Sequence, residues 1–62
     1  MTILEKVTNR LSSGKLASAQ AMANQFNTTK ATIVARVADL RNEGMDIVTT
    51  TNRSGDLAYK LS

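Results

Sequence analysis

The apolar residues of this chain change their spacing at Gly44. Before Gly44 they recur at intervals of three and four residues, which places them on one face of a helix. After it, two short segments rich in β-branched and aromatic residues alternate between apolar and polar positions, as strands do. One core must therefore serve both helices and a pair of strands, and we predict an α+β fold.

Length and composition restrict how such a fold can be stabilised. The chain has 62 residues, and we expect residues 1–62 to form a single domain. It contains no cysteine, histidine or proline, so packing, a partner, or both must replace the disulfides and metal sites that support many small domains. No apolar run exceeds three residues, which excludes a membrane span and a secretory signal. We expect a soluble, cytoplasmic protein without a membrane partner.

The individual elements follow from the spacing and from end signals. The predicted elements are helices over residues 2–13, 19–26 and 30–43, a short extended segment over 15–17, and strands over 46–51 and 56–61. Thr2, Ser18 and Thr29 are the expected N-caps, because a hydroxyl can accept from unpaired amides of the first turn. Asn27 is expected to adopt a positive φ in the turn before the third helix. Leu16 is expected to point into the core.

The strands are expected to form a hairpin, because Asn52-Arg53-Ser54-Gly55 between them is typical of a turn. Tyr59 and Phe26, the one tyrosine and the one phenylalanine, both lie on predicted inward faces. Binding of single-stranded nucleic acid by base stacking is therefore disfavoured, since it needs several exposed rings.

The net charge of +3 favours a nucleic-acid partner without requiring one, because a modest positive charge also serves solubility. The acidic residues argue against catalysis. They are spread over several predicted elements, with no histidine to act as a base and no glycine-rich phosphate loop. We expect no enzyme activity, no cofactor, no metal and no small-molecule ligand.

Two helices joined by a tight turn and followed by a hairpin are the elements of a winged helix-turn-helix. The segment LRNEGMDIV at residues 40–48 is close to an L-R-x-E-G-x-x-I junction, and Tyr59-Lys60-Leu61 matches a terminal Y-x-L. From residue 16 to residue 61 the chain resembles the winged helix-turn-helix of the biotin operon repressor's N-terminal domain and related regulators. The resemblance implies three helices followed by a two-stranded wing, and a DNA-binding transcriptional regulator.

For a DNA-binding protein of this type, the helix over residues 30–43 is expected in the major groove of double-stranded DNA, and the wing over 52–55 near the backbone or minor groove. The candidate DNA-binding residues are Thr28, Thr29, Lys30, Thr32, Arg36 and Arg53. Threonine hydroxyls and a helix N-terminus suit phosphate oxygens, and the cations supply charge. Each residue also has an ordinary structural interpretation, as a helix cap, a solvated turn residue or a solubilising charge.

One feature of the third helix favours a different function. Its predicted open face is apolar and consists of Ala31, Val34, Ala35 and Ala38. Such a face would suit a partner helix or a second subunit as well as a groove. The alternative hypothesis is a protein–protein interaction module that docks through this face. If the chain instead binds DNA, useful specificity would require a homodimer, because a monomer offers few phosphate contacts.

The chain begins with a capped helix and ends as the last strand finishes, so we expect a stand-alone protein. Regulators without an effector domain are often carried by phage and mobile elements. We therefore expect it at the nucleoid, or in the host cytoplasm if the protein is viral.

Overall fold

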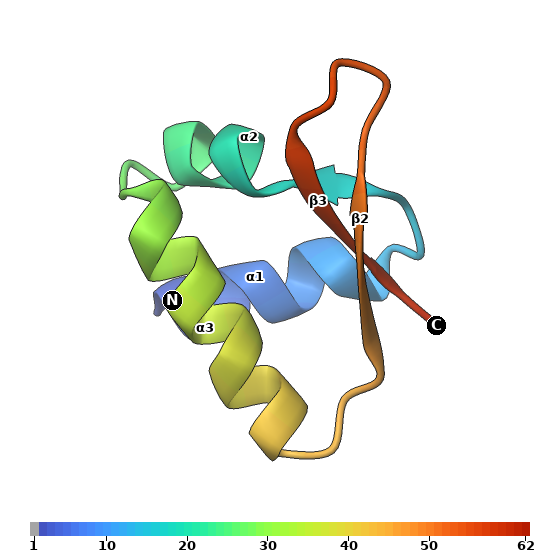
Figure 1. Cartoon of the computed structure of the whole chain (residues 1–62). Helices are drawn as coiled ribbons and strands as arrows, with labels where there is room; N and C mark the ends of the chain where they lie inside the picture. The colour runs from blue at the N-terminus through green and yellow to red at the C-terminus, as the bar shows by residue number, and fades with distance from the viewer. Residues whose placement is uncertain (1) are drawn as a thin grey trace.

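The computed structural model describes residues 2–62, which form three helices and a three-stranded antiparallel sheet (Figure 1). In chain order the elements are α1 (Ile3–Ser12), β1 (Ala17–Ser18), α2 (Ala19–Gln25), α3 (Lys30–Asn42), β2 (Ile47–Thr51) and β3 (Leu57–Leu61). The predicted helices and hairpin strands are confirmed, and each of their ends lies within one residue of its expected position. The α+β, winged helix-turn-helix architecture is confirmed with them.

The short strand β1 corrects one prediction. The expected extended segment, 15–17, overlaps β1 at Ala17 alone. Ala17 pairs with Tyr59 of β3 and is buried, whereas Leu16 is 40% exposed, so the prediction that Leu16 points into the core was wrong. Neighbouring side chains of an extended segment point to opposite sides, so burying the Ala17 side chain turns Leu16 outward.

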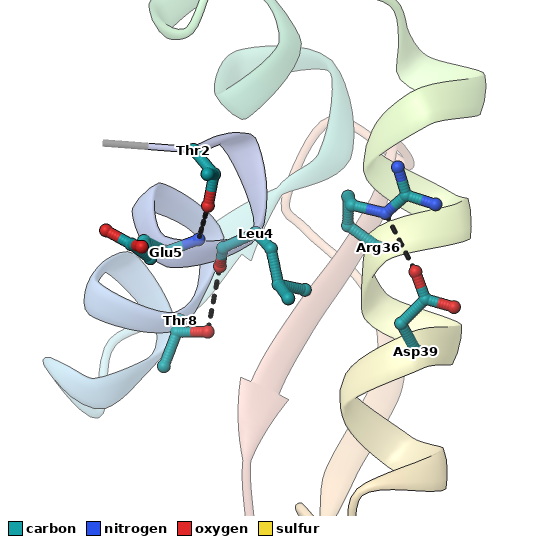
Figure 2. A network of polar contacts seen from close by, with 6 residues as sticks. All are labelled: Thr2, Leu4, Glu5, Thr8, Arg36 and Asp39. Atoms are coloured by element: carbon teal, nitrogen blue, oxygen red, sulfur yellow. Dashed lines mark hydrogen bonds and ion pairs between the residues drawn. The ribbon is translucent and has the colours of Figure 1, made fainter.

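The three expected N-caps are confirmed. The Thr2 hydroxyl accepts from the Glu5 amide at 3.1 Å (Figure 2), and the Ser18 hydroxyl accepts from the Ala21 amide at 3.3 Å. Thr29 caps α3 in the same way. Because each cap satisfies an amide that has no partner within its helix, all three helices begin where the sequence places a hydroxyl.

A left-handed residue ends α2 and turns the chain towards α3. Asn27 has φ 54°, as predicted. The Thr28 amide donates to the Ala23 carbonyl at 2.8 Å, and the Asn27 amide donates to the Asn24 carbonyl at 3.4 Å. These two bonds are the Schellman pattern that closes a helix C-terminus. Because Thr29 caps α3 only two residues after Asn27, the two helices are joined by a tight turn.

The core lies between the three helices and the inner face of the sheet. Its largest fully buried side chains are Val7 and Leu11 of α1, Met22 of α2, and Ile33 and Val37 of α3. Tyr59 of β3 is buried against this cluster, and the half-buried Phe26 packs on its edge. Both aromatic rings are therefore part of the packing, as the sequence pattern indicates.

Arg41 links the C-terminal end of α3 to β2. Its Nε and Nη2 atoms donate to the Ile47 carbonyl at 3.1 and 2.9 Å, and Nη2 also bonds the Thr49 hydroxyl. The guanidinium carbon lies 5.7 Å from the centre of the Tyr59 ring, within the range of a cation–π contact. One side chain thus contacts a carbonyl, a hydroxyl and an aromatic ring of the hairpin.

The Ile47 carbonyl needs this contact because β3 cannot supply a donor. The Ser62 amide donates to the Asp46 carbonyl, and hydrogen-bonded pairs alternate along an antiparallel ladder. Ile47 therefore directs its carbonyl away from β3, to the outer edge of the sheet. Arg41 satisfies this carbonyl and covers part of an edge that could otherwise pair with another strand.

Replacing Arg41 tests this link. Arg41→Ala is expected to lower the free energy of unfolding by about 1–2 kcal/mol, the usual cost of losing hydrogen bonds from a charged donor to a partly buried acceptor. Arg41→Lys should recover only part of the loss, since an ammonium lacks the planar fork. Urea denaturation measures both. The matched control is Arg53→Ala on the exposed hairpin turn, and equal stabilities for Arg41→Ala and this control would contradict the link.

Candidate nucleic-acid interface

The N-terminal end of α3 brings together four of the six predicted site residues. Thr28 is half-buried in the turn, Thr29 is the N-cap, Lys30 is the first residue of α3 and exposed, and Thr32 completes the first turn. The Thr29 hydroxyl accepts from the Thr32 amide at 3.2 Å, and the two hydroxyls lie 2.9 Å apart in a hydrogen bond. We call these four residues the α3 N-terminal cluster.

The electrostatics of this cluster suit an anion. The first turn of α3 contains no acidic residue, so the partial positive charge of the helix N-terminus is not neutralised there. Lys30 adds a full positive charge at the same end. Amides of the first turn, threonine hydroxyls and an ammonium are groups that commonly contact a phosphate of the DNA backbone.

Arg36 lies further along α3 and is paired. Its Nε donates to Asp39 Oδ2 at 2.9 Å, one turn later on the same helix (Figure 2). The two side chains are 38% and 49% exposed, so the pair is at the surface. Asp39 offsets the charge of Arg36. This part of α3 therefore carries less net positive charge than an unpaired arginine would give it.

Arg53 lies in the hairpin turn, separate from the α3 N-terminal cluster, and is exposed. The turn is ordered by Asn52, whose Oδ1 accepts from the amides of Ser54 at 2.9 Å and Asp56 at 3.0 Å. Figure 1 shows α3 and the hairpin diverging from the loop over residues 43–46 that connects them. The N-terminal end of α3 and the hairpin turn therefore lie at the ends of these two elements that are farthest from the loop joining them.

Sequence reasoning gave no role to Arg41, although it lies within the LRNEG segment that carries the family resemblance. Its guanidinium is held by Ile47 and Thr49, so it orients the hairpin. No pattern in the sequence indicates this role, because the acceptor is a backbone carbonyl of β2.

A hollow between α1 and α2 lies apart from these residues. It is lined by Lys6, Asn9, Arg10, Gln25 and Phe26. Lys6 Nζ is 6.0 Å from the centre of the Phe26 ring, so this lysine covers the edge of the core. Within residues 2–62, no group of acidic, histidine or cysteine side chains could hold a metal ion. No helix in this described part is long and apolar enough to cross a membrane.

The helix-turn-helix, its capped third helix and the following hairpin together define a winged helix-turn-helix DNA-binding domain. Comparison with protein families agrees: residues 2–59 match the HTH domain, and the chain belongs to this family. Comparison with curated proteins and with solved structures found no significant match. The family supports a DNA-binding role in transcription regulation, and its domains are typically not enzymes.

The Arg36–Asp39 pair generates a prediction for DNA affinity. Asp39→Asn is expected to tighten duplex binding several-fold at low salt, because it removes a charge that repels phosphate and releases Arg36. The dependence of log affinity on log salt should steepen by up to about one unit, as for one added phosphate contact. Fluorescence anisotropy at two salt concentrations measures both. Glu5→Gln on α1 removes the same charge elsewhere, and an equal gain from this control would contradict a local effect.

Proposed function

We propose that the protein regulates transcription by binding double-stranded DNA, with α3 in the major groove and the β2–β3 hairpin against the backbone or minor groove. The observation that carries this proposal is the α3 N-terminal cluster, which presents an uncompensated cation and capping hydroxyls on the third helix of an HTH domain. A groove-bound helix makes its base contacts from this end.

Each candidate residue then has a distinct role. Thr28 and Thr29 bond phosphate oxygens, and Lys30 contacts a phosphate at the groove edge. Thr32, at the end of the first turn of α3, contacts a base. Arg36 contacts a phosphate once DNA competes with Asp39 for its guanidinium.

The hairpin supplies the second contact region. Arg53 is exposed at the turn, where it can enter a narrow minor groove whose negative potential attracts arginine. Arg41 supports this contact indirectly, because it fixes β2 relative to α3. DNA affinity therefore depends on α3 and the β2–β3 hairpin being held in one relative orientation.

Two substitutions test the proposal. Lys30→Ala and Arg53→Ala are each expected to weaken binding to every duplex and to flatten the salt dependence by about one unit, as for one lost phosphate contact. Duplex titrations at two salt concentrations measure this. The control is Arg10→Ala on α1, which removes the same charge outside the proposed interface. Unchanged affinity in both variants, or an equal loss in the control, would contradict the proposal.

A second candidate function is protein–protein interaction through the exposed apolar face of α3. Val34 is 40% exposed, and its alanine neighbours are exposed with it. If this face instead joins two copies of the chain, sedimentation should show a dimer that is insensitive to salt, and Val34→Asp should dissociate it. A monomer at the concentrations used for DNA titration would contradict this second function.

A further inference from the structure

The outward face of α3 has few side chains that can form hydrogen bonds. Ile33, Val37 and Leu40 are buried, and the opposite face carries exposed Ala31, Ala35 and Ala38, with Val34 at its border. The three alanines and the valine span about two turns of the helix. We call these four residues the methyl face of α3.

Beyond the first turn of α3, its polar side chains do not compensate for this. The Arg36 guanidinium is bonded to Asp39, and the Arg41 guanidinium is bonded to the Ile47 carbonyl. The one side-chain amide of the helix, Asn42, belongs to its last residue. The methyl face therefore lacks the groups that usually recognise guanine, adenine and cytosine, which are arginine or lysine, side-chain amides and carboxylates.

Thymine is the base that such a face can distinguish. In the major groove the thymine C5-methyl is the one apolar group among the base edges, and alanine or similar methyls contact it directly. Small side chains also let the helix approach the bases closely. From these observations we propose that α3 recognises thymine methyl groups by apolar contact through Val34 and its alanine neighbours. This inference rests on the proposed function, in which α3 is the DNA-binding helix of an HTH domain, and the methyl face then determines which bases it can distinguish.

The test removes the methyl group and changes no other atom of the base. An alternating A·T duplex is compared with the same duplex carrying deoxyuracil for every thymine, which keeps the pairing and the phosphate charge. The expected result is weaker binding of the deoxyuracil duplex by about fourfold per contacted methyl, with an unchanged salt dependence. In a G·C duplex, 5-methylcytosine for cytosine should strengthen binding by a similar factor.

A pair of valines provides the matched protein control. Val34→Ala on α3 should reduce the thymine-to-deoxyuracil ratio, while Val48→Ala should leave it unchanged, because Val48 is similarly exposed on β2, outside the methyl face. Equal affinity for the two A·T-type duplexes, with normal salt dependence, would overturn the thymine inference and leave the proposed function intact. Failure of both duplexes to bind at low salt would overturn the thymine inference and the proposed function together.

Discussion

The packing of one stripe of α3 against the other two helices decides which side chains of α3 are available to contact DNA. Ile33, Val37 and Leu40 are at most 3% exposed, and both α1 and α2 pack on α3. Once these residues are buried, the helical period decides which side chains face solvent. The alanine-rich outer face of α3 is therefore a direct consequence of how the core is packed. A rotation of α3 that exposed other residues would remove this stripe from the core.

The turns at the two ends of α3 determine how α3 and the β2–β3 hairpin are oriented. At the start of α3, Asn27 in a left-handed conformation and Thr29 as the cap join α2 to α3 through a tight turn. At its other end, Gly44 has φ 102°, and Met45 donates its amide to the Leu40 carbonyl at 3.1 Å, which closes the helix and starts the path to β2. Arg41 then bonds the first residue of β2. The orientation of the hairpin is set within a few residues of α3.

Local features of the sequence were sufficient to predict most of this fold. Hydroxyl caps, left-handed residues and apolar spacing depend on neighbours within a few positions, and all of these predictions were confirmed. Leu16 failed because the register of a two-residue strand is set by β3, some forty residues later in the chain. The Arg36–Asp39 pair has the spacing of neighbours on a helix and could have been predicted. The Arg41 contact could not, because it requires the position of an outward-facing carbonyl on β2. The roles of the candidate site residues in DNA contact stay predictions.

The central claim is that α3 and the hairpin contact DNA together, and amide chemical shifts report on this directly. Titration of the protein with duplex DNA at low salt should move the signals of residues 28–36 and 52–55, while those of α1 and of the buried Val37 and Leu40 of α3 stay nearly constant. Added salt should reverse the shifts, since the contacts are largely to phosphate. A titration in which neither segment responds, or in which the shifts are confined to α1, would contradict the account.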